Sequence, residues 1–171
     1  MHDDALARLL AKDEIRERLH DYVRAMDRID DTLGRSVFHP DATADYGAIY
    51  LGTGHGFIDF VHEAHERMLV HTHHLGSIGI DVDIDADRAV SEAYVMVTLR
   101  LADGEGGWKD SRAWGRYLDH WEKRDGRWAI AARRYVHEFD DLAAVTEWQF
   151  RTEGRRDWED ASYGLFEGTE R

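Results

Sequence analysis

Apolar residues recur at helical spacing through the first thirty positions, and this pattern predicts the longest element of the chain. The intervening positions are rich in Arg, Glu and Asp, so one face is apolar and the other is charged. We expect a single amphipathic helix from about Asp4 to Ile29. The residues that define its apolar face are Leu6, Leu9, Leu10, Ile15, Leu19, Val23 and Met26.

Shorter elements follow the long helix. Asp30 and Asp31 are typical of a helix break and an N-cap, because a carboxylate at that position accepts a hydrogen bond from a free backbone N–H. In chain order we expect a short helix over Thr32–Phe38 ended by His39 and Pro40, a strand over Thr43–Tyr46, a loop containing Gly52, Gly54 and Gly56, and a helix over Phe57–Met68.

From His71 onward the period of the pattern falls to two, which is typical of strands with one wet face. Asp125 and Gly126 predict a tight turn between the last two of these strands. Because helices come first and antiparallel strands follow, we expect an α+β domain in which a curved sheet wraps around the helices. The expected strands are Ile78–Ile84, Ala89–Leu101, Ala113–Lys123 and Arg127–Glu138.

The pattern weakens after Asp140. Leu142, Val145 and Phe150 are spaced as in a short helix, and residues 151–171 are polar with a few aromatic residues between them. We therefore predict a catalytic domain over residues 1–140 and, within the same domain, a tail over residues 141–171. The tail is expected to act as a lid or an oligomer arm, or to fray.

Composition and charge exclude several classes of partner. The chain has 171 residues, which suits one domain, and 35 acidic against 22 basic residues give a net charge of −13. Lys and Arg are scattered among the acids, so nucleic acid and anionic membrane are not expected partners. The absence of Cys excludes disulfides, Cys-ligated metals and thiol nucleophiles. An N-terminus without an apolar core segment predicts a cytoplasmic protein.

Two polar residues flank the apolar face of the long helix. With about 100° per residue, Tyr22 and Asp27 fall on opposite margins of the stripe. A carboxylate at such a margin is either a solvated edge residue or a group directed into a cavity between helix and sheet. The helical pattern by itself leaves both possibilities open for Asp27.

The sequence His71-Thr72-His73-His74 is the densest cluster of reactive side chains. On a strand, His71 and His73 share one face and His74 lies on the other. That spacing suits a metal-binding pair, to which the helical His62 and His65 could add ligands, although no diagnostic third and fourth ligand follows. The alternatives are an imidazole that transfers protons beside a carboxylate such as Asp27, and an ordinary hydrogen-bonded His without a catalytic role. All three remain open at this point.

Arg133 and Arg134 lie in the middle of the last predicted strand. One of two adjacent side chains faces solvent, and the other could stabilise negative charge that develops on a substrate. Strict alternation places Arg133 opposite Trp128 and Ile130, and a bulge would reverse this. The predicted substrate-binding residues are Tyr46, Tyr94, Trp114 and His74, where the aromatic side chains could form the walls of a pocket or belong to the ordinary core.

These positions together resemble the SnoaL-like branch of the nuclear-transport-factor-two-like superfamily, over roughly Leu6 to Asp140. The likeness is strongest to its lyases: hexachlorocyclohexane dehydrochlorinase, scytalone dehydratase and bile-acid dehydratase. Asp27 stands where they have a catalytic Asp late in the first helix, with Tyr22 five residues earlier. His73 begins the first long strand ahead of a Gly-containing step, and Arg133 follows the Asp-Gly turn and its Trp at the family spacing.

The resemblance implies a cone-shaped fold and a cofactor-free elimination from a hydrophobic, ring-containing small molecule. In that mechanism His73, paired with Asp27, takes a proton from carbon, Arg133 stabilises the leaving group or an enolate oxygen, and Tyr22 binds the substrate or donates a proton. No metal and no cofactor are expected, and relatives are commonly trimers or dimers, which implies a homo-oligomer. Alternatives are an isomerase or cyclase of the same fold, a non-catalytic small subunit of a ring-hydroxylating dioxygenase, and a metal-dependent enzyme.

Overall fold

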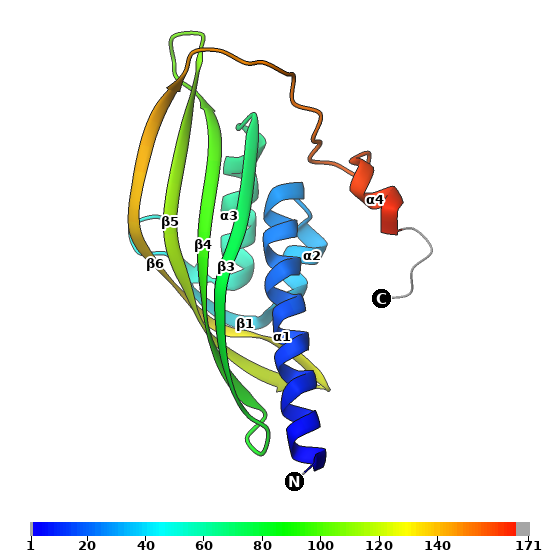
Figure 1. Cartoon of the computed structure of the whole chain (residues 1–171). Coiled ribbons are helices and arrows are strands. Elements are labelled where there is room, and N and C mark those ends of the chain that lie inside the picture. The colour runs from blue at the N-terminus through cyan, green and yellow to red at the C-terminus, as the bar shows by residue number, and fades with distance from the viewer. Residues whose placement is uncertain (1, 167–171) are drawn as a thin grey trace.

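A computed structural model describes residues 2–166 and shows helices packed on one side of a curved sheet (Figure 1). The helices are α1 (His2–Arg28), α2 (Asp31–Ser36), α3 (Gly54–Glu66) and α4 (Ala161–Phe166). The strands are β1 (Phe38–Asp45), β2 (Leu51–Thr53), β3 (Val70–Asp83), β4 (Arg88–Ala102), β5 (Trp108–Arg124) and β6 (Arg127–Val145). The predicted α+β class, with a long N-terminal helix against a curved sheet, is confirmed.

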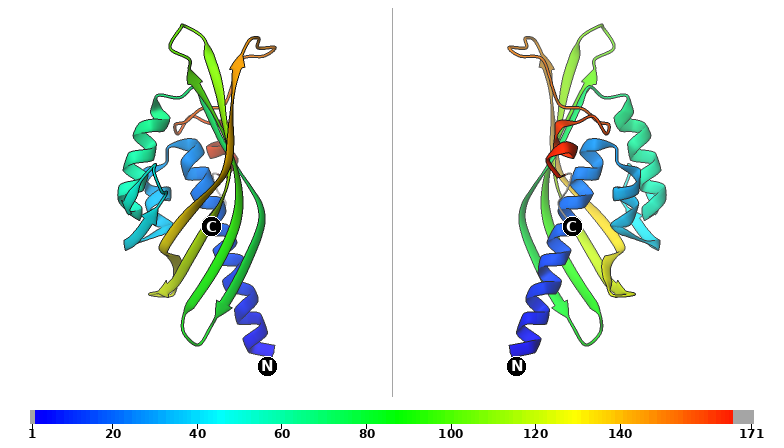
Figure 2. Two further views of the ribbon diagram at one scale, coloured as in Figure 1. Left: turned by 90° about the vertical axis from the view of Figure 1, so that its left-hand side faces the viewer. Right: turned by 90° about the vertical axis from the view of Figure 1, so that its right-hand side faces the viewer.

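The six strands form one open sheet in the order β2-β1-β6-β5-β4-β3. The expected antiparallel meander runs from β3 to β6, whereas β1 pairs in parallel with β6 and makes the sheet mixed. Strand β1 begins at Phe38, several residues before the predicted start. It accommodates Pro40 because the pairing with β6 is interrupted between Phe38 and Thr43, where no ladder hydrogen bond needs the missing N–H. Figure 2 shows the twist of the sheet and the helices on its concave side.

Helix α1 packs against β3 and supplies much of the core. Ile15, Leu19 and Met26 are completely buried, as their spacing predicts. The predicted apolar face is nevertheless shorter than expected. Leu6, Leu9 and Leu10 are 55%, 60% and 59% exposed, so the apolar face is buried only from Ala11 onward.

The concave face is tightly packed in one half of the sheet and more open in the other. Along β4 the inward residues Ala89, Ser91, Ala93 and Val95 are buried, whereas the inward residues that follow, beginning with Val97, are only half-buried. The cone that the sheet forms with the helices is therefore open at the end where β3 begins. Residues at this open end can contact a ligand.

The hairpin of β5 and β6 is longer than expected, and this corrects one prediction about the C-terminal region. β6 continues to Val145, so the expected short helix over Leu142, Val145 and Phe150 is wrong. The reason is that β5 begins at Trp108 and offers a backbone partner to each residue from Phe139 to Val145. The predicted turn is confirmed: Asp125 and Gly126 both have positive φ, 52° and 78°, as the tight hairpin requires.

After β6 the chain leaves the sheet and crosses to the far side of α1, where it forms α4 (Figure 1). The tail predicted for residues 141–171 thus includes the end of β6, and residues 167–171 lie outside the described part. Its function as a lid or oligomer arm stays a prediction, as does the division of the chain at residue 140. Among residues 2–166 no helix is long and apolar enough to span a membrane.

Candidate active site

The structure places Asp27 against His73 where the last turn of α1 meets the start of β3. The Nδ1 atom of His73 lies 2.7 Å from Asp27 Oδ1, and the backbone N–H of His73 donates to Oδ2 at 3.1 Å. The two side chains are 7% and 19% exposed for His73 and Asp27. Both carboxylate oxygens of Asp27 therefore bind His73. These two contacts set the orientation of the imidazole ring, and Nε2 is the ring nitrogen that points away from Asp27.

Two further histidines surround this pair. His71 Nδ1 lies 3.9 Å from Asp27 Oδ1, which is beyond hydrogen-bond distance. The His71 ring stacks on that of His65 with centroids 4.3 Å apart, and His65 lies 5.8 Å from the His73 ring. His65 Nδ1 meets the backbone oxygen of Met26 at 3.3 Å. The α1 terminus is thus enclosed by imidazoles from α3 and β3.

Burial and neighbouring rings shift the protonation equilibria in this cluster. Burial raises the pKa of the Asp27 carboxyl, but the adjacent His71 and His73 more than offset it, so that pKa is about 2. Burial lowers the pKa of His65 to about 3, with a further decrease from the neighbouring His71. Burial also lowers the pKa of His62 and of His71. At neutral pH Asp27 is therefore a carboxylate, and these three rings are uncharged.

The metal alternative is not supported by this arrangement. Across residues 2–166, no group of three or more His, Asp or Glu side chains has the geometry to hold a metal ion. His71 and His73 do share one face, as their spacing predicts. However, His65 stacks its ring plane on His71 and does not converge with it on a common point.

Arg133 lies in a second cluster at the centre of the packed half of the sheet. Its guanidinium makes two hydrogen bonds to Asp119, at 2.7 and 2.8 Å, and both side chains are fully buried. The rings of Tyr22 and Tyr117 cover it, each with its centroid 4.2 Å from the guanidinium carbon. Its Nη1 atom is buried and has no hydrogen-bond partner in the described chain.

Tyr22 and Tyr46 join this second cluster through their hydroxyls, which are 2.7 Å apart. Both rings are buried, and burial raises the pKa of each phenol. Since α1 rises about 1.5 Å per residue, Tyr22 lies about 7.5 Å along the axis from Asp27. The four predicted catalytic residues thus occupy two clusters separated by a distance comparable to one or two substrate rings.

Asp119 was missed by sequence reasoning. Its position carried a signal, because Tyr117, Asp119 and Trp121 alternate toward one face of β5 and two of the three are aromatic core residues. An acid in such a row is buried, and a buried acid requires a cationic partner.

The structure places three of the four predicted substrate-binding residues, His74, Tyr94 and Trp114, on the outer face of the sheet. There they line one hollow beside the ladder that Arg116 forms with Glu92 and Glu138. Strand alternation explains this result, because His74 follows the inward His73 and is directly opposite Met96, which in turn pairs with Trp114. Of the four predicted pocket residues, only Tyr46 faces the interior.

The comparisons with known proteins show the family and the fold. A family model described as a SnoaL-like domain matches residues 7–134. The chain belongs to the SnoaL-like family. This assignment confirms the predicted resemblance, and the fold of this SnoaL-like protein matches solved structures over most of its length. A comparison with curated protein sequences finds no significant match.

Two structural neighbours of this SnoaL-like protein have lyase names. Hexachlorocyclohexane dehydrochlorinase LinA-type3 from Novosphingobium barchaimii superposes with a TM-score of 0.72 at 18% identity, covering 86% of this chain and 99% of that one. A protein from Novosphingobium aromaticivorans, provisionally assigned as a scytalone dehydratase, gives 0.69 at 20% identity, covering 88% and 94%. At these identities the likeness establishes the shared fold alone.

Acid is expected to destabilise this SnoaL-like protein through its buried histidines. His65 has a pKa of about 3 when folded against an ordinary value of 6.5, so between these values the unfolded chain binds a proton that the folded chain does not. Stability therefore decreases as pH falls from about 6.5 toward 3, by about 1.4 kcal/mol per pH unit from His65 alone. Urea denaturation at several pH values measures this slope.

A matched pair of variants tests whether His65 causes the loss of stability in acid. His65→Gln should flatten the dependence of unfolding free energy on pH, whereas His120→Gln, which changes an exposed ring on β5, should leave it unchanged. Equal slopes in the wild type and in the His65 variant would show that His65 does not contribute.

Proposed function

We propose that the protein is a cofactor-independent lyase that catalyses a dehydratase-type elimination. The observation that carries the proposal is the Asp27–His73 pair, in which a carboxylate with a pKa of about 2 receives the Nδ1–H of the imidazole. In the proposed mechanism Nδ1 carries the proton that it donates to Asp27, and Nε2 has the lone pair that acts as the base. A neutral imidazole oriented in this way is a general base suited to neutral pH.

In the proposed reaction His73 Nε2 removes a proton from a substrate carbon. The electron pair of the broken C–H bond forms a double bond to the adjacent carbon, and the leaving group departs from that carbon with its bonding pair. Asp27 stabilises the imidazolium that results, as the carboxylate does in other acid–base dyads. Hydroxide or halide departs as an anion and is expected to be stabilised by a hydrogen-bond donor.

Arg133 and Tyr22 are the proposed donors. Arg133 Nη1 is the one guanidinium nitrogen of that side chain not used by Asp119, and Tyr22 lies directly over the guanidinium. Their burial favours the role, because donors removed from water interact more strongly with a developing charge. Tyr46 stacks on Phe57 at a centroid distance of 3.7 Å and supplies aromatic surface for a ring-containing substrate.

A screen by product mass tests the proposal. Hydroxylated and halogenated ring compounds are incubated with the protein, and products are expected to have lost one molecule of water or hydrogen halide. A product of unchanged mass would instead identify an isomerase or cyclase of the same fold. No turnover, together with copurification of a large iron-containing protein, would favour the non-catalytic subunit. The predicted homo-oligomer and cytoplasmic location are not needed for this test and stay predictions.

A further inference from the structure

The C-terminal segment is fixed to the end of α1 through one buried acid. Asp160 is 8% exposed and accepts hydrogen bonds from the backbone N–H groups of Arg155 and Ser162, at 2.9 and 3.0 Å. Its Oδ1 atom also lies 3.3 Å from Arg28 Nε. The residue that anchors the segment is therefore bound to the immediate neighbour of Asp27.

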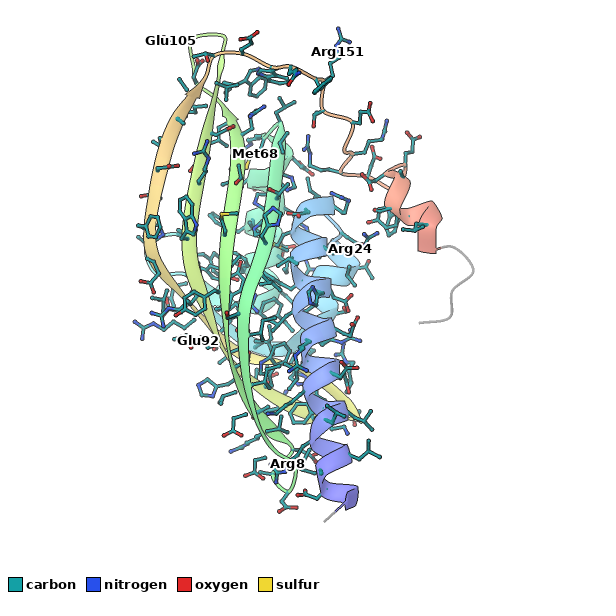
Figure 3. All side chains as sticks on the ribbon, viewed as in Figure 1. Arg8, Arg24, Met68, Glu92, Glu105 and Arg151 are labelled. Carbon is teal, nitrogen blue, oxygen red and sulfur yellow. The ribbon has the colours of Figure 1, made fainter. Side chains whose placement is uncertain are left out.

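Further contacts attach the segment on both sides of Asp27. Tyr163 donates its hydroxyl to Asp30 Oδ2 at 3.1 Å, and Arg24 reaches Ser162 Oγ at 3.2 Å. The Arg24 guanidinium also lies 4.9 Å from the centre of the Tyr163 ring. In Figure 3, Arg24 is on the side of α1 that faces this segment. Such side-chain contacts are more than a frayed tail would make.

These anchors hold Arg156 near the end of α1, because the backbone N–H of the preceding Arg155 is bound to Asp160, which in turn contacts Arg28. Arg156 is half-buried, and its charge acts on both His71 and Arg28. Its neighbour Arg155 is exposed and pairs with Asp157 and Glu159. Within the described part of the chain, no carboxylate lies within ion-pair distance of Arg156. The acids among residues 2–166 thus leave one arginine near the candidate site without a counter-charge.

We propose that Arg156 is a substrate-binding residue, held near the end of α1 that carries Asp27 by the C-terminal segment, and that it binds a carboxylate group on the substrate. The proposal deepens the proposed function and rests on it for the reaction. A half-buried cation without a partner is unfavourable, and an anionic ligand would supply the missing counter-charge. The planar guanidinium matches a carboxylate with two parallel hydrogen bonds, which favours a carboxylate over a single-atom anion.

Binding of simple ring acids to the full chain tests the assignment. Benzoate and cyclohexanecarboxylate are compared by calorimetry with the neutral amides of the same shape, benzamide and cyclohexanecarboxamide. The wild type is expected to prefer each acid by about tenfold or more, the range of a charge-assisted hydrogen bond. Arg156→Gln should abolish this preference. Arg155→Gln removes the same charge one residue away and should retain it.

Two results would overturn the assignment. One is a wild type that binds acids no better than amides. The other is an equal loss of preference in the Arg155 and Arg156 variants. That result would show that the preference for acids depends on the net charge of the protein and not on Arg156. Proton NMR of the histidine rings gives a separate readout: because Arg156 lowers the pKa of His71, that pKa should rise in Arg156→Gln. An unchanged His71 pKa would show that Arg156 does not lie at the site.

The binding measurement does not need turnover, so failure of this proposal is distinct from failure of the lyase mechanism. If Asp27 and His73 variants keep full turnover while the acid preference depends on Arg156, the mechanism is wrong and the carboxylate site stands. If those variants are inactive and the acid preference is missing, the mechanism stands and the role of Arg156 is wrong.

Discussion

Replacing Asp27 with Asn is expected to lower kcat/KM by about 10⁴-fold on any substrate that the protein dehydrates or dehydrohalogenates. Asp27 accepts two hydrogen bonds from His73, one from Nδ1 and one from the backbone N–H. An amide offers one acceptor oxygen and one NH₂ group, so it cannot accept both. When the NH₂ group faces the ring, the proton of the imidazole moves to Nε2, and the base can no longer accept a proton from carbon.

The loss should come from chemistry and not from unfolding. Glu17→Gln makes the same charge change on an exposed position of the same helix and is expected to retain full activity. His73→Gln should match the Asp27 variant, and the double variant should be no worse than either single one, because residues that act as a unit are not additive. Folded Asp27→Asn and His73→Gln proteins with wild-type kcat/KM would disprove the mechanism.

The second large effect is expected on stability. Asp119→Ala should reduce the free energy of unfolding by about 3–5 kcal/mol, because it removes one partner of a buried ion pair and leaves the other charged. Arg133 cannot lose its proton, and its side chain is fully buried between Tyr22 and Tyr117. Urea denaturation monitored by tryptophan fluorescence measures the change, since Trp121 lies two residues along β5.

An exposed ion pair gives the comparison. Asp41 pairs with Arg124 at 2.6 Å, and the Asp41 side chain is 67% exposed. Water replaces its interactions when it is removed, so Asp41→Ala should shift the urea midpoint far less than Asp119→Ala. Similar midpoints for the two variants would mean that water reaches Arg133 and that its burial does not control stability.

The placement of Arg133 shows where alternation along a strand was insufficient. Strict alternation placed Arg133 on the face opposite Trp128 and Ile130, yet all three are buried. The pairing of β5 with β6 shifts between His120 and Trp121, where an extra residue enters β6. A bulge of this kind reverses every later side chain, and its position depends on the partner strand.

Strand β3, which carries His71, His73 and His74, shows the opposite case, because alternation along one strand was sufficient there. No irregularity lies between His71 and Leu75, so the prediction that His71 and His73 share a face opposite His74 is confirmed. The same alternation could have placed His74, and its partner Met96 across the strand pair, on the outer face. Predicting the outward positions of Tyr94 and Trp114 required knowledge of the register of β4 and β5, which lies outside any one strand.

The sequence by itself determined the features that depend on residues close to one another in the chain. These are the long first helix with Asp27 near its end, the Asp30 cap, the Asp-Gly turn, the strands from β3 to β6 and the family to which the chain belongs. Each depends on spacing or turn chemistry within a few residues, and such signals are present before the chain folds.

Only the tertiary structure decided which of these residues meet. It paired β1 with β6 in parallel, gave Arg133 the partner Asp119, and attached the C-terminal segment to the end of α1 through Asp160 and Arg28. The physical reason is that such contacts join positions far apart in the sequence, and their formation depends on strand register, bulges and burial. A net charge of −13 predicts none of these contacts.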